Sequence, residues 1–184
     1  MNAPPPAGQQ AALSELSKLY LFKGVAPEAL AELVHHGRLR TFEPGEVLFE
    51  AGAPADHAVL VITGKLNVGL PVGDARRLIG DIRAGEVAGE TALLSHNGLR
   101  GATLTAELPT VALELTPELM LELADNPAVF ALEMHLLGAM SRRIREINLN
   151  IKKATRGAAE AGVEPEPAQG SLLGRLRSFF GGTR

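Results

Sequence analysis

Cysteine is absent from this chain of 184 residues. Its absence excludes disulfide bonds and thiolate metal sites, and it fits a reducing compartment. Tryptophan is also absent and tyrosine occurs once, so the core of a folded domain must be mainly aliphatic. No run of about 18 apolar residues could cross a bilayer, and no N-terminal pattern of basic, apolar and small residues indicates secretion. Together these absences predict a cytoplasmic protein.

Charge of neither sign dominates the whole chain, whose formal net charge is −3. The two signs are nevertheless distributed unevenly. Residues 1–151 hold 12 lysines and arginines against 18 acidic residues, whereas residues 152–184 hold six against three. A domain that binds nucleic acid presents a basic surface. The acidic body therefore argues against direct DNA binding, and we expect none.

Residues that could bind a metal or act in catalysis do not occur at the spacings that such sites require. The histidines do not fall at metal-ligand intervals, and the dipeptide Ser95-His96 lacks the surroundings of a nucleophile. His57 begins a predicted strand, but the second histidine and the glutamate of a cupin-type metal site are missing. The many acidic residues form no placed catalytic pair. We therefore expect no metal, no cofactor and no enzymatic activity.

The N-terminal part of the chain predicts a short disordered segment followed by two helices. Residues 1–10 are rich in proline, alanine and glutamine, a composition typical of disorder. Leucines then recur at helical spacing across Ala11–Tyr20. Pro27 suits the first turn of a second helix, which should end near Gly37.

Between Arg38 and Leu115 the pattern changes to short apolar runs separated by glycine-containing turns. Several short strands at this spacing predict a mostly β fold with flanking helices, built as a double-stranded β-helix, or jelly-roll barrel. A helical turn at Glu90–Leu94 interrupts the strands, as a site loop would. The predicted strands are Val47–Phe49, Ala58–Ile62, Leu66–Leu70, Leu78–Ile82, Ala102–Ala106 and Val111–Leu115.

A long C-terminal helix follows the predicted strands. Thr116-Pro117 predicts the start of a helix that ends near Asp125, and Asn126-Pro127 then caps a helix that runs to Thr155. Apolar residues at heptad spacing along this helix favour a dimeric coiled coil, although a helix that simply lies on the barrel is the alternative. The residues of the predicted dimer seam are Phe130, Leu137, Met140, Ile144, Ile147 and Ile151.

The chain ends in two segments of different character. Residues 156–170 consist mainly of alanine, glycine, glutamate and proline, and they predict a flexible linker. Residues 171–184 form a short basic tail that is amphipathic on a helical wheel, which favours docking to a partner protein or a membrane surface. A terminus that binds nothing is the alternative. The tail residues expected to dock are Leu172, Leu173, Leu176, Phe179 and Phe180.

The most informative segment is Gly85–Thr103. It places Glu90 at the mouth of a short helical turn and returns Arg100 ten residues later at the start of a strand. Backbone N–H groups and one guanidinium can hold an anion, whereas a carboxylate beside them accepts hydrogen bonds from sugar hydroxyls. This layout indicates a pocket for a phosphate attached to a sugar. A carboxylate that merely caps a helix, or an ion pair between Glu90 and Arg100, is the simpler alternative.

Gly85–Thr103 resembles the phosphate-binding cassette of the cyclic-nucleotide-binding domain, as in the cyclic-AMP receptor proteins and the regulatory subunits of cyclic-AMP-dependent kinase. Phe42–Gly52 is similar to the family's entry hairpin, and Ala58–Val68 is similar to its central strand pair. The predicted domain covers residues 11–155. Relatives that regulate transcription continue into a helix-turn-helix domain, which we do not expect in the short remainder of this chain.

The resemblance implies a cyclic AMP or cyclic GMP ligand and a role for each cassette residue. Glu90 would accept hydrogen bonds from the ribose, Arg100 would bind the phosphate, and Gly89 would let the backbone approach the ligand. Asn148 of the long helix could bond a base edge or could be merely exposed, so the choice of base stays open. Gly101 stands where many relatives carry serine or threonine. The expected ligand-binding residues are Gly89, Glu90, Thr91, Ala92, Arg100, Gly101, Ala102 and Asn148.

Two functions are compatible with these patterns. The first is a cyclic-nucleotide sensor, a homodimer that binds cyclic AMP or cyclic GMP and signals through its long helix and tail. The alternative is a non-enzymatic scaffold or adaptor with the same fold, which docks a partner protein or a membrane through the amphipathic tail. The two functions differ in whether the nucleotide binds at all.

Overall fold

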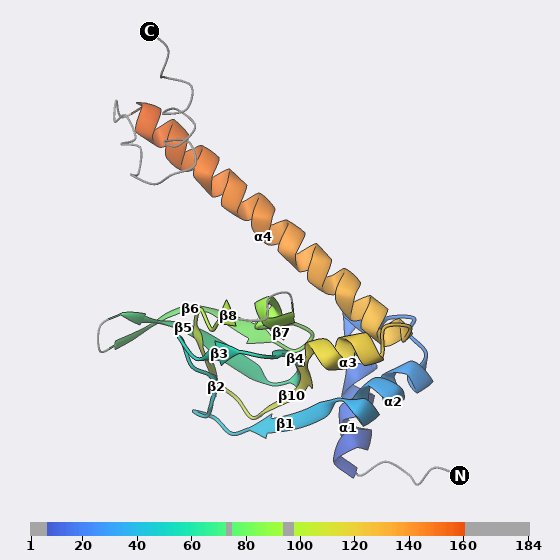
Figure 1. Cartoon of the computed structure of the whole chain (residues 1–184). Coiled ribbons are helices and arrows are strands. Elements are labelled where there is room, and N and C mark those ends of the chain that lie inside the picture. Colours follow the sequence, from blue (N-terminus) through green and yellow to red (C-terminus); the bar gives the residue numbers. More distant parts are fainter. Residues whose placement is uncertain (1–6, 73–74, 94–97, 161–184) are drawn as a thin grey trace. The chain divides into compact units, whose positions relative to one another are not determined.

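The computed structural model describes residues 7–72, 75–93 and 98–160. The chain divides into two units, Met1–Leu137 and Gly138–Arg184, which are taken in turn. The first unit holds the strands and the shorter helices (Figure 1). The helix α4 (Pro127–Glu160) begins in the first unit and continues into the second.

Two antiparallel sheets make up the β-roll of the first unit. One sheet has the strand order β1 (Arg38–Phe42), β10 (Thr110–Leu115), β4 (Ala58–Thr63), β7 (Val87–Ala88). The other has the order β2 (Val47–Phe49), β9 (Thr103–Ala106), β5 (Lys65–Val72), β6 (Ala75–Arg83). A short ladder joins β3 (Pro54–Ala55) to β8 (Gly98–Leu99). Strands far apart in sequence thus pair within each sheet, which confirms the predicted jelly roll.

The six predicted strands are all present, and β2 has the predicted bounds. The sequence did not predict β1, β3, β7 and β8. Three of these contain only two residues each, which is too short for an alternating pattern to be visible. In β1 the sequence Arg-Leu-Arg-Thr-Phe alternates, but most of its residues are exposed, so it lacks the apolar run of a central strand.

Strand β4 explains how the two layers of the core are separated. Its side chains alternate between two clusters: Ala58, Leu60 and Ile62 join the apolar cluster that contains the helices. Val59 and Val61 join the cluster between the two sheets. Because both faces of the strand are covered, its sequence reads as an uninterrupted apolar run.

The N-terminal helices pack on the sheet that contains β4. Helix α1 (Ala7–Leu16) begins four residues earlier than predicted, so residues 7–10 are helical where disorder was expected. A short 3₁₀ helix, η1 (Tyr20–Phe22), follows it, and there Phe22 is buried while Tyr20 is exposed. Helix α2 (Pro27–His36) starts at the predicted proline. Figure 1 shows α1, α2 and α3 (Pro117–Glu122) at one end of the strands.

Side-chain caps fix the starts of the last two helices. The hydroxyl of Thr116 accepts a hydrogen bond from the N–H of Leu119 at 3.1 Å, as its predicted N-cap role requires. Buried Asn126 accepts a hydrogen bond from the N–H of Ala128 at 2.7 Å and donates to the Ala29 carbonyl at 3.1 Å. Asn126 therefore both caps α4 and ties it to α2.

In the second unit the structure describes the remainder of α4. The helix continues to Glu160, five residues beyond its predicted end, and so includes Gly157 of the predicted linker, because a single glycine weakens a helix without necessarily ending it. Residues 161–170 of the predicted linker lie outside the described residues. The tail residues Leu172, Leu173, Leu176, Phe179 and Phe180 lie outside them as well. Within the described ranges, no helix is both long and apolar enough to cross a membrane.

Candidate functional site

The cassette turn begins where β7 ends. Gly89 follows the strand with a φ of +77°, and the 3₁₀ helix η2 (Glu90–Leu93) starts immediately after it. The N–H of Ala92 donates to the Gly89 carbonyl at 3.0 Å, which closes the turn. The carboxylate of Glu90 therefore stands at the first position of a helical turn, as the sequence predicts.

Arg100 returns to this turn ten residues after Glu90. Its backbone is held on both sides, since its N–H donates to the Ala53 carbonyl at 2.8 Å and its carbonyl accepts from the Gly52 N–H at 2.8 Å. Its side chain is 5% exposed. Within the described part of the chain, the buried Nη1 has no hydrogen-bond partner. A buried guanidinium nitrogen without an acceptor is costly, and a bound anion would satisfy it.

Asp56 is the acidic partner of Arg100. Its Oδ1 lies 3.4 Å from Nη2 of Arg100 and 2.6 Å from Nδ1 of His57. The hydrogen bond from His57 holds the pKa of the Asp56 carboxyl below its usual value, and Arg100 contributes a smaller effect in the same direction. Burial lowers the pKa of Arg100, which the charge of Asp56 opposes. The guanidinium remains charged, because it loses its proton only at very high pH.

The ring of Phe49, on β2, packs against the guanidinium of Arg100. The Cζ atom of Arg100 lies 3.5 Å from the centre of the Phe49 ring, a cation–π arrangement. The ring of His57 meets the same phenyl ring edge to face at 5.2 Å. Phe49, Asp56 and His57 thus form one cluster with Arg100. Sequence reasoning did not predict this cluster, although the segment Phe42–Gly52 that contains Phe49 was recognised.

Gly89 allows the arginine to approach the turn. A Cβ atom at this position would lie 2.6 Å from Nη1 of Arg100 and 2.8 Å from the Phe49 ring. Any larger residue would therefore displace the guanidinium, besides being strained at a positive φ. The structure thus places Gly89 and Arg100, two of the predicted ligand residues, next to each other, while their contact with a ligand stays a prediction.

The chemistry of this cluster suits a monoanionic phosphate ester. Nη1 of Arg100, which has no hydrogen-bond partner among the described residues, can donate charge-assisted hydrogen bonds to a phosphate. Glu90, the residue after Gly89, carries carboxylate oxygens that can accept hydrogen bonds. The cluster has no metal centre: no group of three or more potential ligands occurs in the described ranges. The residues present therefore fit a ligand that combines an anion with hydroxyl groups.

The other predicted ligand residues are placed less tightly. Thr91 is exposed, and the N–H of Ala92 is used inside the turn. Ala102 is half-buried, whereas Gly101 is exposed and has room for a side chain, since a Cβ there would meet nothing within 4 Å. Asn148 is an exposed residue of α4 in the second unit, and its contact with a base stays a prediction.

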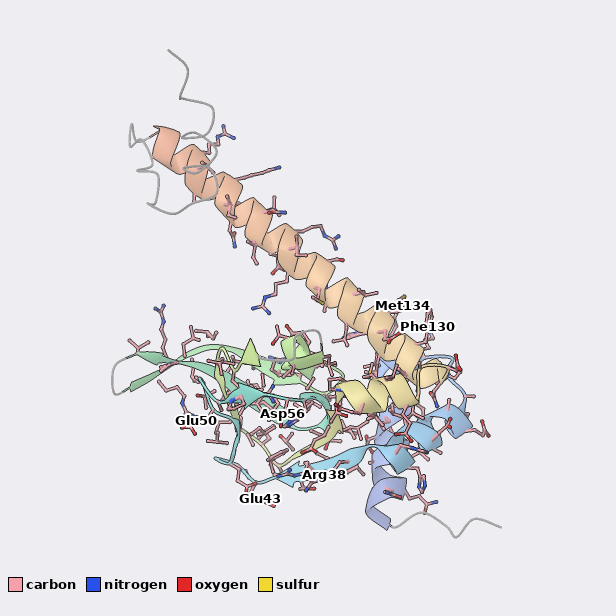
Figure 2. All side chains as sticks on the ribbon, in the orientation of Figure 1. Arg38, Glu43, Glu50, Asp56, Phe130 and Met134 are labelled. Atoms are coloured by element: carbon pink, nitrogen blue, oxygen red, sulfur yellow. The ribbon has the colours of Figure 1, made fainter. Side chains whose placement is uncertain are left out.

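The predicted dimer seam follows α4. Phe130 and Leu137 in the first unit are 59% and 56% exposed, and Figure 2 shows Phe130 one turn from exposed Met134. In the second unit Ile144, Ile147 and Ile151 are between 50% and 58% exposed, while Met140 is half-buried. Leu132, by contrast, is fully buried in the core. Pairing through the seam stays a prediction.

Comparison with known proteins agrees with this fold. Residues 39–126 match the family model of the cyclic nucleotide-binding domain. The acetyltransferase Pat of Mycolicibacterium smegmatis is 33% identical over 132 residues, which are 72% of this chain and 36% of that protein. A CRP-like cAMP-activated global transcriptional regulator of Mycobacterium tuberculosis is 28% identical over 138 residues, 74% of this chain and 60% of that protein.

The solved structures show the same architecture. The catabolite activator protein of Thermus thermophilus superposes with a TM-score of 0.62 and 28% identity, over 73% of this chain and 62% of that one. The fold and the buried arginine beside the turn define a β-roll domain with a candidate anion site. Residues 39–126 of the chain belong to the cyclic nucleotide-binding domain family. The chain spans between about a third and three fifths of the two curated relatives named above.

Proposed function

We propose that this protein is a cyclic-nucleotide sensor that binds cyclic AMP or cyclic GMP without transforming it chemically. One observation carries the proposal: the buried Nη1 of Arg100 lacks a hydrogen-bond partner among the described residues and lies against Gly89. In this proposal the cyclic phosphate binds Arg100, and the ribose hydroxyl donates to Glu90. The cassette N–H groups of Thr91 and Ala92 complete the phosphate site after the turn adjusts, because the Ala92 N–H here donates to the Gly89 carbonyl.

Cyclic AMP is the first ligand to test. The M. tuberculosis relative is described as cAMP-activated, which supports this order. Asn148 is the residue that we propose to read the base, and its side-chain amide can both donate to and accept from a base edge.

The output of the proposed sensor is a homodimer formed through α4. Five of the six seam residues present exposed apolar side chains, all but Met140, and burial against a second copy would remove this surface from water. A ligand that prefers one arrangement of α4 would then shift the population of the dimer between two states. The tail that follows α4 is the proposed reporter.

The direct test is isothermal titration calorimetry of folded protein, freed of co-purified ligand, with cyclic AMP and cyclic GMP. We expect saturable binding of one of them. The variant Arg100→Lys keeps the positive charge but loses the paired donors, and should weaken binding by about tenfold or more. Absence of heat with both nucleotides on folded protein would contradict the sensor and favour the scaffold function.

A further inference from the structure

The charge of the chain changes sign between its two units. Met1–Leu137 contains nine lysines and arginines against 17 acidic residues, whereas Gly138–Arg184 contains nine against four. Six of these last nine cations lie on the part of α4 that belongs to the second unit, where Glu146 is the one acidic residue before Glu160. The second unit therefore presents a basic helix, in contrast to the acidic first unit.

Four of these cations form a stripe along α4 together with one leucine. The stripe consists of Arg142, Arg145, Leu149, Lys152 and Arg156, which follow one another at intervals of three, four, three and four residues. Since each residue turns a helix by about 100°, all five fall within about 80° of its circumference. This heptad spacing is the one by which a helix packs along another helix. We call these five residues the basic seam.

The basic seam and the predicted dimer seam occupy different faces of α4. Leu149 follows Ile144 of the dimer seam by five residues, which turns it about 140° around the helix. All five residues of the basic seam are exposed, and Leu149 is 56% exposed. A dimer that buries Ile144 would therefore leave the basic seam open to a further partner.

Among the described residues, three cations of the basic seam have no acidic partner, namely Arg142, Arg145 and Lys152. Glu146 follows Arg142 by four residues, a spacing that allows an ion pair on a helix, yet within the described ranges no ion pair joins the two. Like charges three or four residues apart repel one another along a helix. An anionic partner would therefore stabilise this part of α4 as well as bind to it.

We propose that the basic seam docks an acidic helix of another protein. Carboxylates at the same intervals would each meet one cation, turn by turn over about 21 Å of helix. The long arginine and lysine side chains can pack their apolar stems on such a helix while their charged ends reach the carboxylates. An apolar residue at the centre of the acidic helix would cover Leu149. This interaction is separate from nucleotide binding, since it concerns only residues of the second unit.

Other anionic partners fit the basic seam less well. A bilayer binds an amphipathic helix through apolar side chains that insert beside the basic ones, whereas the isoleucines of α4 lie on the face of the dimer seam. Nucleic acid would offer phosphates to the cations but nothing apolar to cover Leu149, and the acidic first unit would repel it. The basic seam of a second copy would bring like charges together.

The test is fluorescence anisotropy of full-length protein with a labelled synthetic peptide about three heptads long. The peptide carries glutamate at the positions that would face the four cations, leucine at the position that would face Leu149, and alanine and glutamine elsewhere. A control peptide of the same composition has its glutamates spread around the helix. We expect saturable binding that is about tenfold tighter for the first peptide and that weakens as salt is added.

Matched charge reversals isolate the basic seam. Arg145→Glu combined with Lys152→Glu should weaken binding of the first peptide by about tenfold or more, because two attractive pairs become repulsive. Lys23→Glu combined with Arg77→Glu makes the same change in net charge at exposed sites of the first unit, and it should retain the affinity. Leu149→Ala should weaken binding by about threefold, since less apolar surface is covered. Circular dichroism should show that every variant keeps the helix content of the unmodified protein.

The outcomes distinguish the acidic helix from the other partners. Equal affinity for the two peptides, or undiminished affinity after reversal of Arg145 and Lys152, would overturn the proposal. Binding of a short DNA duplex, or of vesicles of phosphatidylcholine and phosphatidylglycerol, that depends on these two cations without any binding of the first peptide would overturn it in favour of that partner. Peptide binding by a protein that binds neither cyclic nucleotide would support the docking and contradict only the proposed sensor.

Discussion

The guanidinium of Arg100 lies on the ring of Phe49, with Cζ 3.5 Å from the ring centre. The two residues are 51 positions apart in the sequence: Phe49 lies on strand β2, and Arg100 directly follows strand β8. The phenyl ring is itself buried in the cluster between the sheets. The cation is therefore positioned by the core of the β-roll, and only weakly by its acidic neighbour Asp56.

Replacement of Phe49 should affect binding as well as stability. Phe49→Leu removes the aromatic support and should weaken nucleotide binding by about threefold to tenfold, the value of a cation–π contact of about 1 kcal/mol. Phe42→Leu is the control, because Phe42 belongs to the same cluster and lies 5.6 Å from the guanidinium of Arg40, outside the cassette. Chemical unfolding should show a loss of about 1–2 kcal/mol in both variants. Equal affinities in calorimetry would contradict a positioning role for Phe49.

Gly89 should not tolerate a methyl group. In Gly89→Ala the new Cβ would lie 2.6 Å from Nη1 of Arg100, so the guanidinium must move and binding should weaken by about tenfold or more. Gly45→Ala carries the same penalty of a positive φ, here +91°, but its Cβ meets nothing within 4 Å. Thermal unfolding should show that Gly45→Ala loses about 1 kcal/mol of stability and that Gly89→Ala loses at least as much, because its Cβ also lies 2.8 Å from the Phe49 ring. A comparable loss of affinity in Gly45→Ala would show that backbone strain, and not the displaced arginine, is responsible.

Asp56 should stabilise the protein in a pH-dependent way. The pKa of its carboxyl is lowered in the fold, chiefly by the hydrogen bond from His57, so its contribution is present above the unfolded pKa of 3.8. That contribution is lost as the pH falls through the lower folded value. Urea unfolding should therefore show that Asp56→Asn is less stable than the unmodified protein near neutral pH, and that the difference shrinks in acid.

The same variant should respond more strongly to the ligand. Asp56→Asn removes the anion that competes for Arg100, so cyclic nucleotide should raise its melting temperature by more than it raises that of the unmodified protein. Asp81→Asn is the control, since the pKa of Asp81 is lowered by a 2.6 Å hydrogen bond from Arg83 on strand β6. It should show the acid profile without the larger ligand effect. Identical ligand-induced shifts in both variants would argue against competition at Arg100.

The dimer seam can be tested on the two faces of α4. Ile144 and Leu149 are almost equally exposed, at 58% and 56%, but they lie on opposite sides of the helix because they are five residues apart. Ile144→Asp should convert a dimer into a monomer in light scattering, whereas Leu149→Asp should leave it a dimer. A monomeric unmodified protein, or the reverse result, would contradict pairing through the seam.

Part of the site could be predicted from one continuous stretch of sequence. Gly89, Glu90 and Arg100 fall within twelve residues, so their spacing is visible without a fold. Asp56 and Phe49 reach the same guanidinium from segments that are more than 40 residues earlier. Nothing local marks either residue, because Asp56 precedes a strand like many turn residues and Phe49 reads as an ordinary core residue.

The sequence by itself determined the jelly roll, the helical turn at Glu90 and the capped start of α4. These features depend on local signals: apolar periodicity, glycine turns, and the Thr116 and Asn126 caps. Only the tertiary structure decided which partner Arg100 meets and which of its nitrogens is left without one. The reason is physical, since the contacts of a buried charge depend on where the sheets place distant strands. Strand pairing of β3 with β8 sets that placement, and two-residue strands carry no readable pattern of their own.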